Sequence, residues 1–143
     1  MEHIDAALEK RVWQRVYGKE SPAGAHTPPL RQLCCTARDC ADLYRSLRQE
    51  SKGAQVQYFA GMERDMNQAA RKLASMMDEQ EQLPAPVGCP GCSRRRKLEL
   101  LTLWTDGWSR RCREYSRDER CGKLLSELAR LGERHARSLR AMR

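Results

Sequence analysis

The stretch LRQLCCTARDCADLYRSLRQE, residues 30–50, places an apolar residue at every third or fourth position. Positions three and four apart lie on the same face of an α-helix, so this spacing gives the segment one continuous apolar face. We therefore predict a helix over residues 30–50 that buries this face in a core. The apolar positions are Leu30, Leu33, Cys34, Ala37, Ala41, Tyr44 and Leu47.

Three further segments carry the same periodicity and predict three more helices. The first covers residues 54–82 and ends at the Leu-Pro-Ala-Pro sequence of residues 83–86, because a residue before proline disfavours the helical conformation. The second covers residues 95–119. After a break at residues 120–122, the third continues to Met142.

The composition excludes a sheet. The chain has 143 residues, which is the size of one domain, and it contains 16 Leu and 15 Ala. It has only one Ile, four Val and four Thr, and these β-branched residues are the ones that favour strands. An all-α fold is the class that remains.

Two connectors divide the chain. Residues 18–29 contain three prolines and two glycines, which predicts a linker between a short N-terminal helix, residues 1–17, and a domain over residues 30–143. Inside that domain residues 83–94 form the only long connector, so the four helices pair as two helical hairpins. We predict an antiparallel four-helix bundle with the N-terminal helix as an appendage.

Several residues are expected in the core of this bundle. Buried free cysteine behaves as a small hydrophobic residue, and methionine fills irregular gaps between helices. Two tryptophans one turn apart are expected in the core or at a dimer contact. The residues are Cys34, Cys40, Cys112, Met62, Met66, Met76, Met77, Trp104 and Trp108.

Four stretches resemble ferritin-like, rubrerythrin-related proteins. LGERHARSL, residues 131–139, resembles the Glu-x-x-His-Ala-x-x-Leu segment of that family, and MERDMNQAARKL, residues 62–73, resembles the first copy of the same segment. DCADLY, residues 39–44, is similar to the small-residue and tyrosine pattern that follows the family's first ligand glutamate. RVWQRV, residues 11–16, is similar to its leading helix. The resemblance covers roughly residues 30–142 and implies a ferritin-like bundle.

The resemblance also implies a di-iron site, with one glutamate from each of two helices and a Glu-x-x-His pair from each of the other two. Of these ligands only His135 has a clear match in this chain. A di-iron centre needs several carboxylates to offset its charge, so we expect a decayed ligand set without di-iron oxidoreductase activity or a bound cofactor. The other matching positions hold Gly132, Met66, Ala69, and Ala37 or Arg38, and the nearest carboxylates on the third helix are Asp106 and Glu114.

Three residues leave alternatives open. His135 is either a core histidine hydrogen-bonded to a neighbouring helix or a remaining metal ligand. Cys89-x-x-Cys92 has the spacing of half a zinc site, which would need further ligands from elsewhere. The same pair could form a reversible disulfide, helped by Arg94–Arg96 and the start of the next helix, or it could be an inert loop pair. A metal-binding or redox protein that uses His135 and the cysteines is therefore an alternative to a purely structural role.

The net charge of +8 lies entirely in the last third of the chain. Residues 1–93 contain twelve basic and twelve acidic residues, whereas residues 94–143 contain fifteen and seven. Two arginine stripes at helical spacing are either solvated helix faces or a track for nucleic-acid phosphates. The stripes are Arg110, Arg113, Arg117 and Arg120, and Arg130, Arg134 and Arg137.

Location and function are predicted mainly by exclusion. No segment approaches the ~18–20 apolar residues that span a bilayer, and the first residues lack the features of a secretion signal. Seven scattered cysteines, an odd number, predict free thiols in a reducing cytoplasm. Without a glycine-rich phosphate loop or a hydrolase motif, we expect a non-catalytic scaffold or interaction protein that binds a protein partner or forms a homodimer. A basic nucleic-acid-binding bundle is a further alternative.

Overall fold

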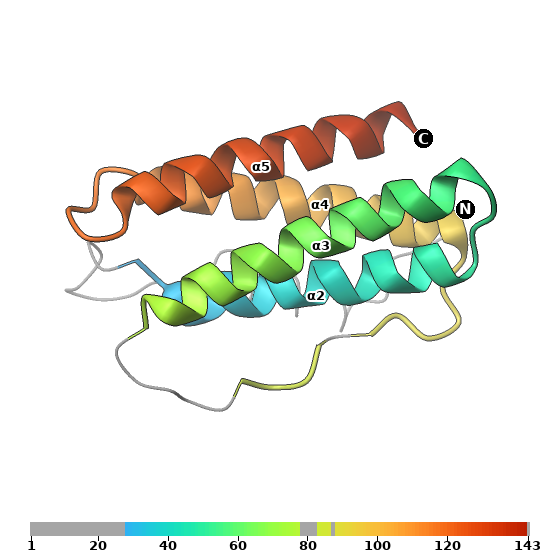
Figure 1. Cartoon of the computed structure of the whole chain (residues 1–143), viewed down its shortest axis with the longest axis horizontal. Helices are drawn as coiled ribbons and strands as arrows, with labels where there is room; N and C mark the ends of the chain where they lie inside the picture. The colour runs from blue at the N-terminus through green and yellow to red at the C-terminus, as the bar shows by residue number, and fades with distance from the viewer. Residues whose placement is uncertain (1–27, 78–82, 87, 143) are drawn as a thin grey trace.

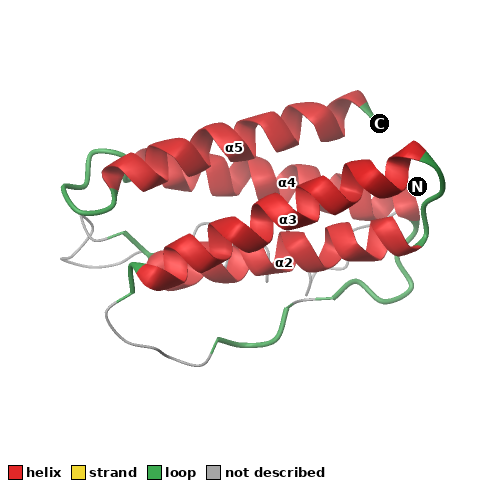
Figure 2. Ribbon diagram, viewed as in Figure 1, coloured by secondary structure: helices red, strands yellow, loops and turns green. Residues whose placement is uncertain are grey.

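The computed structural model describes residues 28–77, 83–86 and 88–142, and these residues form four α-helices (Figure 1). The helices are α2 (Leu30–Gln49), α3 (Ala54–Ser75), α4 (Arg94–Glu114) and α5 (Gly122–Ala141). The described residues contain no strand, which confirms the predicted all-α four-helix bundle (Figure 2). The expected N-terminal helix and the linker as far as residue 27 lie outside the described residues.

The helices run side by side as two antiparallel hairpins, α2–α3 and α4–α5 (Figure 1). The connection from α3 to α4 crosses from one end of the bundle to the other, so α4 runs in the same direction as α3. Hydrogen bonds at both ends fit this arrangement. Arg94 at the start of α4 donates to Ser51 Oγ in the α2–α3 turn over 3.0 Å, and Arg120 donates to the carbonyl of Met76, just beyond α3, over 2.8 Å. The helix directions are therefore up, down, down and up, with one long crossover.

The predicted apolar faces meet between the helices and form one core. Tyr44, Phe59 and Trp108 are wholly buried, and Trp108 Nε1 donates to the carbonyl oxygen of Leu33 over 3.0 Å, which joins α4 to α2. Removing apolar area from water on this scale is the main force that holds such a bundle together. The core also contains residues expected there from the sequence, namely Cys34, Cys40, Cys112, Met62, Met66 and Trp104, whereas Met76 packs against it only partly buried.

Two helices end earlier than the sequence predicts. α3 ends at Ser75 rather than near residue 82, and α4 ends at Glu114 rather than near residue 119. After α4 the carboxylate of Asp118 accepts hydrogen bonds from the backbone N–H groups of Arg120, over 2.9 Å, and Cys121, over 2.7 Å. These local bonds compete with continuation of the helix. Apolar periodicity carries no information about them, so it predicts too long a helix.

Gly132 sets the distance between α4 and α5. A Cβ atom at this position would lie 2.7 Å from Ser109 Cβ, 3.0 Å from Trp108 Cε3 and 3.1 Å from the carbonyl oxygen of Thr105. Only a residue without a side chain allows the two helices to approach this closely. The position that holds a ligand glutamate in the resembled family is thus a packing contact in this chain.

Candidate functional site

Three side chains from three helices form a hydrogen-bonded network that begins in the core. The Tyr44 hydroxyl on α2 lies 2.9 Å from Nδ1 of His135 on α5, and His135 Nε2 lies 3.0 Å from Asp65 Oδ2 on α3. Tyr44 and His135 are buried, while the Asp65 side chain is 46% exposed. The structure therefore gives His135 a hydrogen-bond partner at each ring nitrogen and connects the core to the surface.

The protonation states of Tyr44 and His135 follow from their burial. Desolvation raises the pKa of Tyr44 well above its ordinary value, so the phenol stays neutral and donates its proton to Nδ1. Desolvation also lowers the pKa of His135, although the hydrogen bond to Asp65 opposes this shift. A neutral imidazole that accepts at Nδ1 carries its proton on Nε2, from which it donates to the Asp65 carboxylate. Every polar atom of the ring is then satisfied.

The other positions that match the metal ligands are filled by core packing. Ala37, Met66 and Ala69 are buried at 0–1% exposure, and Gly132 contacts α4 as described above. None of these residues carries an oxygen or nitrogen in its side chain that could bind a hard cation. The donor set around His135 therefore does not fit a pair of iron ions.

The two α4 carboxylates nearest to the expected ligand position, Asp106 and Glu114, are engaged in ion pairs with arginines. Asp106 accepts ion pairs from Arg110, over 3.1 Å, and from Arg140, over 3.3 Å. Glu114 pairs with Arg111 over 3.0 Å and is 54% exposed. Within residues 28–77, 83–86 and 88–142, no group of three or more His, Cys, Asp and Glu side chains is placed to hold a metal ion.

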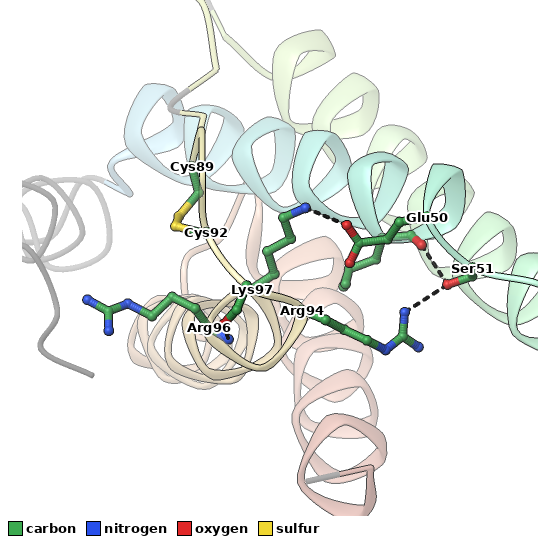
Figure 3. A network of polar contacts seen from close by, with 9 residues as sticks. Glu50, Ser51, Cys89, Cys92, Arg94, Arg96 and Lys97 are labelled. Atoms are coloured by element: carbon green, nitrogen blue, oxygen red, sulfur yellow. Dashed lines mark hydrogen bonds and ion pairs between the residues drawn. A yellow bond between two sulfur atoms is a disulfide. The ribbon is translucent and has the colours of Figure 1, made fainter. Parts of the chain in front are cut away.

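A second chemically distinct site precedes α4, where Cys89 and Cys92 form a disulfide (Figure 3). The backbone N–H of Cys92 donates to the carbonyl of Cys89 over 3.1 Å, and Gly91 has a φ of 76°. This is a type II β-turn, in which Pro90 presets one φ angle and Gly91 supplies the positive one. The turn holds the two Cα atoms 5.5 Å apart, a normal separation for a disulfide.

The disulfide corrects the prediction that all cysteines are free thiols. That prediction holds for five residues, and it is wrong for Cys89 and Cys92, because the Pro-Gly turn brings their side chains together. In this state the pair offers no thiolate to zinc. The free cysteines are all buried, and burial raises the pKa of Cys34, Cys40 and Cys112. They are Cys34, Cys35, Cys40, Cys112 and Cys121.

Basic residues follow the disulfide directly. Ser93 caps α4 by accepting the backbone N–H of Arg96 over 3.1 Å, and the first turn of the helix contains no acidic residue. Lys97 Nζ pairs with Glu50 Oε2 over 2.8 Å, and Arg94 bonds to the neutral oxygens of Ser51 and Gln55. Figure 3 shows Arg94 and Lys97 pointing toward Ser51 and Glu50, while Arg96 points away from them. The disulfide thus lies beside a cationic helix start.

The two arginine stripes differ in how they are neutralised. On α4, Arg110 pairs with Asp106 and Arg113 pairs with Glu133 over 2.7 Å. The α5 stripe is exposed and makes no ion pair within the part of the chain that the structure describes. Exposed acids, Glu127 and Glu133, lie on the same helix. The α5 stripe consists of Arg130, Arg134 and Arg137.

Sequence reasoning identified His135 and the cysteine pair but gave no role to Asp65, and it placed Tyr44 on the apolar face and in the resembled tyrosine pattern without predicting its contact with His135. A hydroxyl on a buried stripe needs a hydrogen-bond partner, so Tyr44 was the available signal for a polar contact in the core. No family model, curated protein or solved structure matches the chain. Among the four described helices, none has an apolar stretch sufficient to cross a lipid bilayer.

Proposed function

We propose that this chain is a ferritin-like, rubrerythrin-related bundle whose di-metal site has decayed and which acts as a non-catalytic scaffold or interaction protein. The helix directions support the relationship, because ferritin-like folds join two antiparallel hairpins by one long crossover. The segments around residues 39–44, 62–73 and 131–139, which carry the resemblance, lie on α2, α3 and α5. These are the helices that meet at His135.

The hydrogen bonding of His135 is the observation that carries the proposal. A metal ligand needs a free ring nitrogen directed at the ion, and here Tyr44 and Asp65 occupy both nitrogens at 2.9 and 3.0 Å. Gly132, where a ligand glutamate would stand, has no room for any side chain. At both positions the residues serve packing and hydrogen bonding rather than metal binding. This supports a function that depends on the surface of the bundle and not on a site in its interior.

The α5 face supports a protein partner over the alternatives. The three arginines of its stripe are exposed and unpaired among the described residues, and the same helix carries two exposed acids, Glu127 just before the stripe and Glu133, which pairs with Arg113, within it. A face with both signs of charge suits a protein, which also carries both signs, better than a nucleic-acid backbone, which carries only negative charge. Because the arginines outnumber the acids, contact of this face with its own copy is disfavoured by the repulsion between arginines. A homodimer would therefore use another surface.

The proposal is tested by metal analysis of the purified chain. The chain is first reduced so that Cys89 and Cys92 are thiols, then incubated with Fe(II) or Zn(II), desalted and measured by elemental analysis, with and without prior blocking of these thiols by N-ethylmaleimide. We expect far less than one ion per chain in every case, and no change in the thermal unfolding midpoint. Stoichiometric metal that survives thiol blocking and is lost in His135→Gln would replace the scaffold by a metalloprotein. Metal lost on thiol blocking would instead establish a cysteine site.

Binding of a fluorescent DNA duplex, titrated against salt, provides the second test. We expect little affinity at moderate salt, because the acids on α5 offset part of the attraction of the arginine stripe for phosphates and salt screens the rest. An affinity that falls steeply with salt and disappears in the Arg130→Gln/Arg134→Gln/Arg137→Gln variant would mean that the stripe binds nucleic acid.

A further inference from the structure

We propose that the disulfide between Cys89 and Cys92 is a thiol–disulfide exchange site for thiols that carry carboxylate groups. This inference does not rest on the scaffold role, since it concerns a loop outside the helices. Three observations carry it: the accessibility of the pair, the local way in which the turn holds it, and the positive charge that follows it.

Accessibility separates this pair from every other cysteine in the chain. Cys89 and Cys92 are partly exposed, and the residues around them, Gly88, Pro90 and Gly91, are exposed. The five free cysteines are 0–6% exposed. A thiol in solution can therefore reach this disulfide. The five free thiols of the protein are buried and do not compete with that thiol.

The disulfide joins residues only three positions apart, and the turn that holds them is already closed by a backbone hydrogen bond of 3.1 Å. A disulfide stabilises a fold most when it closes a long loop, so a bond of this span contributes the least. Opening it leaves the Pro90-Gly91 turn and the Ser93 cap of α4 in place. The pair can therefore be reduced and re-formed without unfolding the bundle.

Positive charge beside the pair distinguishes the two sulfurs. Cys92 directly precedes the capping residue Ser93, so its sulfur is closer along the chain to the helix N-terminus than that of Cys89. The positive end of a helix and nearby cations stabilise a thiolate. Arg94 directs its guanidinium to Ser51, Gln55 and the ring of Phe59, so the charge on the Cys92 side is that of the helix N-terminus and of the basic residues that follow it in sequence. Cys92 is accordingly the better leaving group, and Cys89 is the sulfur that is attacked.

The exchange balances without any further reactant. A substrate thiolate attacks Cys89 Sγ and forms a mixed disulfide, while the bond to Cys92 breaks and Cys92 leaves as a thiolate. A second substrate thiolate attacks the substrate sulfur of the mixed disulfide and releases Cys89. Two substrate thiols become one disulfide, and their two protons and two electrons pass to Cys89 and Cys92. The same steps in reverse, with a substrate disulfide, restore the bond.

Substrate preference is tested with three monothiols of different charge: reduced glutathione, 2-mercaptoethanol and cysteamine, which are anionic, neutral and cationic. Reduction of the native protein is followed by alkylation and mass spectrometry, with rates expressed per thiolate. At low salt we expect glutathione to react fastest and cysteamine slowest, by several-fold at each step. The differences should nearly vanish at about 1 M salt, where charges farther apart than about 3 Å are screened.

Matched variants locate the charge. Arg96→Gln, which removes a charge near the start of α4 and keeps the contacts of Arg94, should narrow the spread of the three rates, while Arg117→Gln, an exposed arginine beyond the other end of α4, should leave it unchanged. Equal rates for the three thiols at low salt would overturn the proposed preference. A disulfide that resists all three thiols until the protein is unfolded would overturn the exchange site itself.

Single-cysteine variants test the order of attack. Cys92→Ser leaves Cys89 free, and Cys89→Ser leaves Cys92 free. We expect iodoacetamide to alkylate Cys92 at lower pH than Cys89, and a trapped mixed disulfide with glutathione to be found on Cys89 in the wild-type protein. The opposite order would refute the assignment. The Cys89→Ser/Cys92→Ser variant should keep the helical circular-dichroism signal, which shows that the bundle folds without the bond.

Discussion

Cysteines lie in opposite environments in the interior of the bundle and in the connector before α4. In the interior, five cysteines and one histidine are buried, and desolvation raises the pKa of Cys34, Cys40 and Cys112 and lowers that of His135, which favours their uncharged forms. In the connector, Cys89 and Cys92 lie at the surface beside a cationic helix start. Reactivity depends on the environment of a group, and the residues that the resembled family uses for chemistry lie in the less reactive region of this chain.

The substitution with the largest expected effect on stability restores a ligand carboxylate to the interior. Gly132→Glu places a side chain where a Cβ atom alone would lie 2.7 Å from Ser109 Cβ, and it buries a charge. We expect a loss of at least about 3 kcal/mol of unfolding free energy in urea titrations, or failure to fold. Wild-type stability combined with new iron binding would show that the interior still has room for a metal site.

Alanine substitutions provide a matched pair for the same test. Gly132→Ala should still destabilise the bundle, by about 1–3 kcal/mol, because the added methyl group overpacks the α4–α5 contact. Gly61 lies within α3, and a Cβ atom added there would have no neighbouring atom within 4 Å. Gly61→Ala should therefore stabilise the protein by about 0.5–1 kcal/mol. Equal effects at the two positions would contradict the close approach of α4 and α5.

The next test removes the hydrogen bond between Tyr44 and His135. Tyr44→Phe deletes the hydroxyl that donates to His135 Nδ1 and leaves a buried acceptor without a partner. We expect a loss of about 1–3 kcal/mol in urea unfolding. Tyr58 is 38% exposed and serves as the control, so Tyr58→Phe should change stability by less than about 0.5 kcal/mol. Similar losses for both variants would mean that the hydroxyl of Tyr44 is not specifically required.

The contrast also separates what the sequence could predict from what it could not. Helix periodicity repeats along the whole length of each segment, so α2, predicted at residues 30–50 and observed at Leu30–Gln49, was found within one residue. The ends of α3 and α4 were missed, and after α4 the local bonds of Asp118 compete with the helix in a way that periodicity does not show. Fold class follows from many residues together, whereas helix ends depend on one or two.

The sites show the same limit. Tyr44 and Asp65 lie 91 and 70 residues from His135, and their contact depends on the rotation and register of three helices, which periodicity leaves undetermined. The Cys89–Cys92 pair is local, and a reversible disulfide was among its predicted states. Only the geometry of the Pro90-Gly91 turn decided between those states.

The next prediction concerns pH. Burial lowers the pKa of His135 from 6.5, against the opposing hydrogen bond to Asp65, and Arg134 also lowers it. The unfolded chain therefore binds this proton first as pH falls, and stability is present above about pH 6.5 and is lost as pH falls through the pKa of the folded state. Urea unfolding between about pH 7.5 and pH 5.5 should show this loss, and His135→Gln should flatten it. An unchanged slope in the variant would assign the loss to other groups.

The smallest expected effect is the difference in coupling energy between two ion pairs, one beside the connector and one on the bundle surface. Lys97 beside the disulfide is 10% exposed and pairs with Glu50 at 2.8 Å, whereas Arg113 and Glu133 on the bundle surface are 49% and 44% exposed. Water screens the second pair more, so double-mutant cycles with Arg113→Met and Glu133→Gln should give a coupling energy of about 0.2–0.5 kcal/mol. Cycles with Lys97→Met and Glu50→Gln should give a coupling of about 1 kcal/mol, because the ammonium group is largely desolvated. Equal couplings would mean that the start of α4 is as well hydrated as the open surface, and the charge preference proposed for the disulfide would then weaken as well.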